Sequence, residues 1–193
     1  MADKRSVKND GEAPKKSSVA KEVISWLKAI AIAVVIALAV DVFIIANASV
    51  PSGSMEDTIP TGARIIGLRL DYHFEDPKRG DVAIFKYPDD ESTDFVKRII
   101  GLPGETVEIK DGKVYINGSS KPLNEPYLRE TPTGDYGPFK VPADSYFMMG
   151  DNREYSHDSR FWKNKYVKRS KLIAKVYFMY FPRFEKLTFS YSQ

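Results

Sequence analysis

Residues 106–116 read TVEIKDGKVYI, and this stretch decides the class of fold that the sequence predicts. Two runs of alternating apolar and polar residues flank a central Asp-Gly dipeptide, which is typical of the two-residue type I′ turn of a β-hairpin. In that register Val107 faces Ile116 and Ile109 faces Val114, so one side of the hairpin is apolar. We therefore expect an antiparallel β structure whose core lies on that side.

Strand patterns continue on both sides of this hairpin. Runs rich in apolar and β-branched residues between turn signals predict further strands at 63–70, 82–86, 146–149 and 172–181. Residues 118–140 contain four prolines and three glycines, which predicts an irregular surface excursion. The predicted fold class is mainly β, with bent antiparallel sheets or a partly closed barrel, preceded by one N-terminal transmembrane helix.

That helix is predicted from the apolar run AIAIAVVIALAVDVFIIANA at 29–48, whose one charge is Asp41. Twenty helical residues span about 30 Å, the thickness of the hydrocarbon core of a bilayer. Two alternatives stay open. A cleavable secretory signal would use the A-x-A site at 46–48, and a soluble protein would bury the run as a core helix.

The sequence predicts three parts: a disordered cytoplasmic tail at 1–20, a transmembrane anchor at 21–48 and an extracytoplasmic β domain at 49–193. Seven of the 29 basic and four of the 26 acidic side chains lie in residues 1–28, which leaves 22 of each sign in the other 165 residues. The positive-inside rule then predicts a single-pass protein of the cell membrane with its N-terminus in the cytoplasm. A folded part without basic excess argues against binding to nucleic acid.

The C-terminal segment 160–193 departs from this balance, with nine basic residues, one acidic residue and several aromatic residues. On an anchored protein such a segment could contact anionic lipid. The alternative is a core strand with a solvated lysine face.

Composition also limits the chemistry. The chain has no cysteine and only two histidines, His73 and His157, which excludes a thiolate zinc site, an iron–sulfur cluster and a cysteine nucleophile. No cofactor and no metal site are predicted. A nucleophile would have to be serine or threonine.

One candidate nucleophile lies in PSGSM at 51–55, directly after the apolar run. Its glycine permits a tight turn in which hydroxyl and amide groups converge, although the same residues would serve as a plain linker. A base for this serine could be a histidine, or Lys97 in the predicted strand DFVKRII at 94–100. Lysine becomes a base when burial lowers its pKa by 2–3 from about 10.4, and the alternative is an ordinary surface lysine.

The run GDNREYSHDSRFW at 150–162 follows an apolar strand and is densely polar, which indicates a networked turn. Asp158 and Arg160 could form a charge pair that fixes its geometry. As a surface turn, its ion pairs would contribute little.

Together these segments resemble the bacterial type I signal peptidases (leader peptidases), in the single-anchor form of Gram-positive bacteria. The resemblance is carried by SGSM at 52–55, RGDV at 79–82, VKRIIGLPGE at 96–105 and the polar run at 150–162. The family commonly has glycine after the tryptophan, where this chain has Lys163, so the chain path after that point is in question.

The resemblance implies a role for each matching residue. Ser54 matches the nucleophile, Lys97 the general base, and Ser52 with the N–H of Ser54 the donors of the oxyanion hole. Ser156 matches a serine that orients the lysine, and Asp158 and Arg160 match a supporting charge pair.

The implied activity is that of a membrane-anchored serine endopeptidase with a Ser-Lys dyad, which removes signal peptides from exported preproteins after a small residue. Its partners would be the preproteins and the lipid bilayer, with a position near the secretion translocon. Two other functions remain open: a self-cleaving regulatory Ser-Lys peptidase, and an inactive exported β module with a cleaved signal. Self-processing after Ala48, between molecules, is a related hypothesis.

Overall fold

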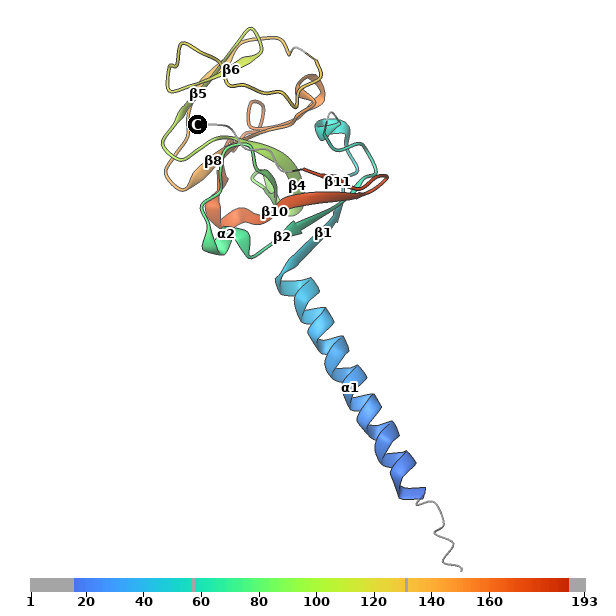
Figure 1. The fold of residues 1–193 in the computed structure, drawn as a ribbon. Coiled ribbons are helices and arrows are strands. Elements are labelled where there is room, and N and C mark those ends of the chain that lie inside the picture. The colour runs from blue at the N-terminus through green and yellow to red at the C-terminus, as the bar shows by residue number, and fades with distance from the viewer. Residues whose placement is uncertain (1–15, 57, 131, 188–193) are drawn as a thin grey trace, which may run out of the picture. The chain divides into compact units, whose positions relative to one another are not determined.

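The computed structural model describes residues 16–56, 58–130 and 132–187, and Figure 1 shows the course of the chain. The chain divides into two units, one up to Ala39 and one from Val40 onward. The elements in chain order are α1 (Lys16–Phe43), β1 (Ile45–Ser49), the 3-10 turn η1 (Gly53–Met55), β2 (Arg64–Leu68), α2 (Asp71–Phe74), β3 (Val82–Tyr87), β4 (Asp90–Gly101), β5 (Thr106–Lys110), β6 (Lys113–Ile116), β7 (Tyr136–Lys140), β8 (Ser145–Met149), η2 (Arg153–Tyr155), β9 (Val167–Lys168), η3 (Arg169–Lys171), β10 (Leu172–Phe181) and β11 (Glu185–Lys186).

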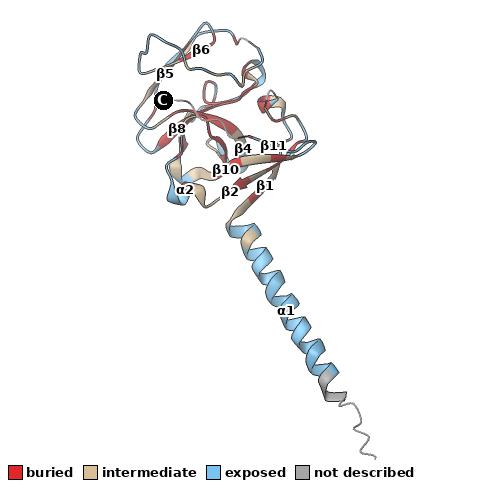
Figure 2. Cartoon of the chain, viewed as in Figure 1, coloured by how far each residue is buried: buried red, intermediate tan, exposed pale blue. Residues whose placement is uncertain are grey.

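Helix α1 is the one described helix that is long and apolar enough to cross a membrane by length and composition, over Val19–Phe43, a test that signal sequences also pass. From Val19 to Phe43 its side chains are exposed, apart from the half-buried Val40 (Figure 2). Of the predicted disordered tail, residues 1–15 lie outside the described residues. The tail prediction fails from Lys16, where the helix begins.

The C-terminal end of the predicted anchor also differs from the structure. The helix ends at Phe43, and Ile45–Ser49 forms β1, which pairs antiparallel with β2. Ala46 is buried in this strand. The apolar run continues through both elements, because α1 is apolar along its exposed surface and β1 buries Ala46 in the sheet, so hydrophobicity alone does not mark the boundary between them.

The main sheet follows the order β1-β2-β10-β3-β4-β8-β9, and β11 pairs with β10 beside this path. Every described strand pair in it is antiparallel. The sheet is open, with β1 and β9 as its two ends, and the predicted mainly β class is confirmed. Strand β10 lies between β2 and β3 and buries Val176 and Met179, which supports a core strand in the basic C-terminal segment.

A second sheet has the order β6-β5-β7 and contains the predicted hairpin. Its register is confirmed, since Val107 pairs with Ile116 and Ile109 with Val114. The expectation that 118–140 is wholly irregular is wrong at its end, because β7 (Tyr136–Lys140) pairs with β5. The glycine and proline of β7 lie on an edge strand, where a missing N–H is tolerated.

Three apolar clusters hold these layers together. One packs η1 against the sheet through Met55, Ile65 and Met179. A second is aromatic and surrounds Trp162, and a third joins the two sheets through residues such as Phe147. The first cluster positions the site, because it fixes the turn that follows β1 against the middle of the sheet.

Candidate active site

Ser54 and Lys97 meet in the structure. Ser54 belongs to η1 and is 7% exposed, whereas Lys97 belongs to β4, pairs with Ala83 of β3 and is 3% exposed. A hydrogen bond joins Lys97 Nζ to Ser54 Oγ, across 43 positions of the sequence. The predicted partners are therefore in contact and buried, as a proton transfer between them requires.

Local hydrogen bonds shape the turn that carries Ser54. Ser52 is extended, and the N–H of Glu56 donates to the carbonyl of Gly53 at 3.0 Å, which closes the turn. Asn152, in the loop after β8, donates from its main-chain N–H to the Ser54 carbonyl at 3.1 Å and from Nδ2 to the Gly53 carbonyl at 2.8 Å. The polar run at 150–162 therefore holds the turn η1 through these two hydrogen bonds of Asn152.

Burial explains how Lys97 could act as a base. Removal from water disfavours the ammonium and lowers the pKa of Lys97 from 10.5 to about 8. The negative charges of Asp158 and Asp151 oppose this shift, and the positive charge of Arg160 adds to it. The ring of Phe95, 5.5 Å from Nζ, belongs to the apolar surroundings. A pKa near 8 leaves roughly one lysine in ten neutral at pH 7.

Ser52 lies next to Ser54 in the structure. Its Oγ is 3.4 Å from Ser54 Oγ, a long contact, and its side chain is exposed. No described residue accepts a hydrogen bond from the main-chain N–H of Ser54. A hydroxyl and an amide N–H are therefore both available beside Ser54 Oγ.

Ser156 is buried, but the structure has no hydrogen bond between it and Lys97, and its hydroxyl finds no partner among the described residues. The orienting role stays a prediction. The hydroxyl does lie close to the site, because a Cβ built on Gly150 would be 2.2 Å from Ser156 Oγ and 2.4 Å from the Ser54 carbonyl oxygen. Only glycine allows both groups to approach at this position.

Asp158 and Arg160 form a buried, bidentate ion pair, with Arg160 Nε and Nη2 at 2.8 and 3.0 Å from the carboxylate oxygens. Asp158 also accepts a hydrogen bond from the Gly150 N–H at 3.0 Å, and Arg160 donates to the Arg153 carbonyl at 2.6 Å. The pair therefore fixes the main chain of the polar run beside Ser54.

Two further buried ion pairs were missed from the sequence. Arg98 and Asp151, 1% and 0% exposed, lie 2.5 Å apart, and Thr58 donates to the same carboxylate. The placement of Arg98 on an apolar strand face was a signal, since a buried guanidinium needs a carboxylate partner. The second pair joins Arg153 to Glu125 at 2.5 Å, both nearly buried.

The ion pair between Glu125 and Arg153 connects the segment 118–140 to the site. Tyr127 donates to Glu125 at 2.7 Å and places its ring 3.9 Å from the Arg98 guanidinium carbon. Burial alone would lower the pKa of Arg153, but the charge of Glu125 outweighs it and raises that pKa above its ordinary value. Nothing in the proline-rich composition of 118–140 pointed to these contacts.

The histidines lie elsewhere. His157 is exposed and stacks on Phe161, and His73 Nδ1 is hydrogen-bonded to the carbonyl of Arg69 at 3.1 Å. Among the described interactions, neither histidine is hydrogen-bonded to Ser54. Lys163 stands where the family pattern has glycine. Its main-chain N–H donates to the Asp89 carboxylate at 2.9 Å, and the chain then runs on to β9.

Comparisons with known proteins agree on one family. The family described as "Signal peptidase, peptidase S26" matches residues 23–181. Signal peptidase I of Leptolyngbya laminosa is 40% identical over 164 residues, which cover 81% of this chain and 78% of that relative. Signal peptidase I of Bacillus licheniformis is 40% identical over 167 residues, covering 81% and 88%. A crystal structure of a signal peptidase I from Enterococcus faecalis is 35% identical, with 52% of this chain and 97% of that chain covered and a TM-score of 0.46.

Proposed function

Because the chain belongs to the signal peptidase family, peptidase S26, and is therefore a peptidase that removes signal peptides, we propose that Ser54 and Lys97 are its catalytic dyad. The observation that carries this proposal is the buried hydrogen bond between Lys97 Nζ and Ser54 Oγ. A serine hydroxyl is a weak nucleophile until a neighbouring base takes its proton. Lys97 supplies that base, since burial brings its pKa to about 8.

The reaction proceeds in two halves. Neutral Lys97 takes the proton of Ser54 Oγ as this oxygen attacks the carbonyl carbon of the scissile bond. The resulting ammonium then protonates the leaving amine, and the acyl group stays on Ser54. In the second half Lys97 takes a proton from a water molecule as the water oxygen attacks the ester carbonyl. The Lys97 ammonium then returns this proton to Ser54 Oγ as the ester bond breaks, and the product leaves with a new carboxyl group.

The charge that develops on the carbonyl oxygen needs hydrogen-bond donors that are already in place. We assign this task to the Ser52 hydroxyl and the Ser54 main-chain N–H. Asp158 and Arg160 support these donors indirectly. They fix the loop after β8, which in turn holds the turn η1. In this proposal Ser156 orients Lys97 once its hydroxyl turns towards Nζ.

Substrates are exported preproteins, which we propose are cut after a small residue at an A-x-A site. A substrate segment in extended conformation would add to a strand edge beside Ser54, so that main-chain hydrogen bonds supply affinity and shallow pockets select small side chains. Chain connectivity supports cleavage near a membrane, because Ser54 follows the end of α1 at Phe43 by 11 positions.

We further propose that Val19–Phe43 is a single-pass anchor in the cell membrane, with the N-terminus in the cytoplasm and the catalytic unit outside. The exposed apolar side chains of α1 support insertion, since a bilayer would cover them. Asp41 lies in the last turn of the helix, where its carboxylate can reach the polar boundary. This orientation would bring the enzyme close to the secretion translocon.

The dyad is tested with the full chain in detergent and a purified preprotein. Ser54→Ala and Lys97→Ala should each abolish cleavage, because one removes the nucleophile and the other the base. His157→Ala is the matched control and should keep most activity. An inactive His157→Ala enzyme together with an active Lys97→Ala enzyme would reverse the assignment.

A further inference from the structure

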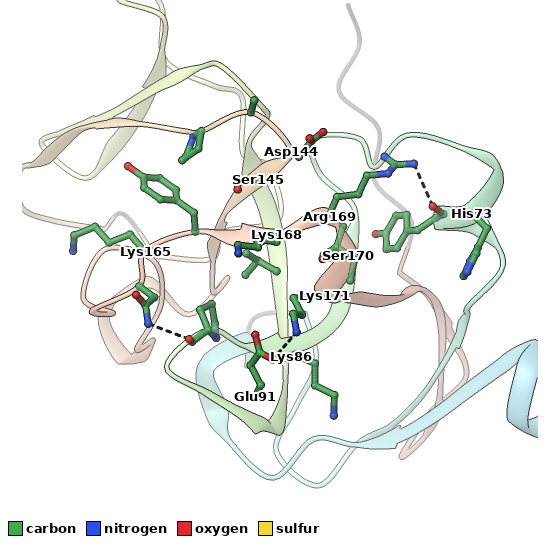
Figure 3. Close-up of a pocket in the computed structure, with 18 residues that line it drawn as sticks. His73, Lys86, Glu91, Asp144, Ser145, Lys165, Lys168, Arg169, Ser170 and Lys171 are labelled. Atoms are coloured by element: carbon green, nitrogen blue, oxygen red, sulfur yellow. Dashed lines mark hydrogen bonds and ion pairs between the residues drawn. The ribbon is translucent and has the colours of Figure 1, made fainter.

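A cavity of about 1080 Å³ lies beside the open end of the main sheet (Figure 3). Its lining includes β9, η3 and the first residue of β8. The cavity and the Ser54–Lys97 pair lie at different positions along strand β3. Lys86, which lines the cavity, is three positions from Ala83, the partner of Lys97. Since a strand rises about 3.3 Å per residue, this separation is about 10 Å.

The lining has more basic than acidic side chains. It holds five cationic side chains and two carboxylates, namely Lys86, Lys165, Lys168, Arg169 and Lys171 with Glu91 and Asp144. Three of the cations are matched by largely exposed carboxylates, in the pairs Lys86–Asp94, Arg169–Asp76 and Lys171–Glu91. These three ion pairs hold Lys86, Arg169 and Lys171 in place around the cavity.

The other two cations have no carboxylate partner among the described residues. Lys165 Nζ donates to the main-chain carbonyls of Arg160 at 3.0 Å and Trp162 at 3.3 Å. Lys168 is exposed and its ammonium has no partner in the part of the chain that the structure describes. Asp144, the second carboxylate of the lining, likewise has no ion-pair partner among the described residues. Two unpaired cations therefore face one unpaired carboxylate, and an anion entering the cavity would meet a net positive charge.

The arrangement favours an extended ligand over a small ion. Figure 3 draws Lys168 near the middle of the view, with Lys165 to its left and Lys86 below it. One small anion cannot contact lysines that are spread in this way, whereas a chain bearing several negative charges can. The volume likewise exceeds what a single phosphate or carboxylate group fills.

Strand β9 indicates the kind of chain. It is the last strand in the order of the main sheet, so one of its sides has no neighbouring strand among the described elements. Both of its residues, Val167 and Lys168, line the cavity. An unpaired strand edge offers main-chain donors and acceptors to an extended peptide. We propose that this cavity is a docking site for an acidic polypeptide segment in extended conformation.

The test uses the full-length Ser54→Ala chain in detergent micelles, so that no probe can be cut and the result does not depend on the proposed dyad. The probe is a fluorescein-labelled octapeptide of alternating glutamate and serine, followed by fluorescence anisotropy. We expect saturable binding that weakens at least fivefold between 50 and 200 mM salt, since the charges are solvent-exposed and salt screens them.

Added variants locate the binding. Lys168→Glu should weaken it about tenfold, because a central charge is reversed. Lys113→Glu makes the same change at an exposed lysine on β6 and should stay within about twofold. Both side chains are exposed, so equal thermal midpoints for the two variants are expected and would exclude a folding defect as the cause.

Three results would overturn the proposal. The first is an absence of saturable binding, or an equal loss in the two lysine variants. The second is undiminished binding of a peptide whose main-chain amides are N-methylated, since strand pairing needs those donors. The third is Lys168-dependent binding of short-chain polyphosphate without binding of the acidic peptide, which would assign the cavity to a different class of ligand.

Discussion

The main-chain N–H of Asn152 donates a 3.1 Å hydrogen bond to the carbonyl oxygen of Ser54. The two residues lie 98 positions apart, and this bond fastens the turn η1 to the loop after β8. Since Asp158 and Arg160 fix the same loop, the orientation of Ser54 Oγ towards Lys97 depends on the polar run as a whole. Holding a catalytic group in the geometry that its reaction requires is a major source of the rate acceleration of enzymes.

Asn152→Ala removes the Nδ2 donor to Gly53 but keeps the main-chain bond. The loss of one hydrogen bond costs about 1 kcal/mol, so kcat should fall about five- to tenfold with little change in KM. Steady-state cleavage of a preprotein measures this split. Asn164→Ala is the control, because its Nδ2 also donates to a carbonyl, in an exposed loop. An equal loss in both variants would contradict a positioning role.

The pKa of Lys97 predicts the dependence of activity on pH. In the proposed mechanism Lys97 must be neutral to act as the base, so kcat/KM should rise with pH and approach its plateau above about 8. A pH profile of cleavage between pH 6 and 10 measures the midpoint. A midpoint near 10.5, the ordinary value for lysine, would mean that burial does not lower the pKa of this group.

Stability should change with pH through the same residue. The folded chain has a lowered pKa at Lys97, so between pH 8 and 10.5 the unfolded chain holds more protons there, and the free energy of unfolding rises with pH across that window. Below pH 8 the cost of the buried charge is about 3 kcal/mol. Urea unfolding of Lys97→Met should show a stability advantage over the wild type at pH 7 that shrinks towards pH 10.5. A constant difference would argue against this assignment.

Glu125→Gln should lower the free energy of unfolding by about 3 kcal/mol, because it leaves the buried Arg153 without its carboxylate. Glu185→Gln breaks an exposed pair with Arg183 and should cost less than about 1 kcal/mol. Denaturant unfolding at pH 7 compares the two. A similar small loss of unfolding free energy in both variants would mean that water reaches Arg153 and that the segment 118–140 does little to stabilise the site.

Strand β1 gives a test of the cleaved-signal alternative. A chain that starts at Val40 keeps β1 and should fold with activity on a soluble precursor peptide. A chain that starts at Ser49, as cleavage after Ala48 would produce, exposes the edge of β2 and loses the buried Ala46. We expect it to melt at a lower temperature and to aggregate. Equal stability of the two chains would favour processing at that site.

Sequence patterns predicted the elements whose turn chemistry is local. The hairpin at 106–116 was predicted with its register, because its Asp-Gly turn and its alternation agree. Strand β1 was missed because its apolar residues extend the run of the helix. Strand β7 was missed because glycine and proline lower β propensity, and only its pairing with β5 makes it a strand.

The candidate site divides in the same way. Motifs marked Ser54, Lys97, Asp158 and Arg160, and the structure brings them together. The pairs of Arg98 and Glu125 depend on contacts between distant segments, which a pattern in one segment cannot encode. The hydrogen bond of Ser156 to Lys97 was expected and is absent from the structure, in which the Ser156 hydroxyl has no partner among the described residues.

All four methionines among the described residues, at 55, 148, 149 and 179, are at most 1% exposed, and the chain contains no cysteine. Oxidants convert methionine to a polar sulfoxide only where they can reach the sulfur. The folded catalytic unit thus presents no accessible sulfur in its described residues, and Met55, next to Ser54, is shielded by the apolar cluster that it belongs to. Placed outside the reducing cytoplasm, as proposed, the turn that carries Ser54 would therefore need no repair of oxidised methionine.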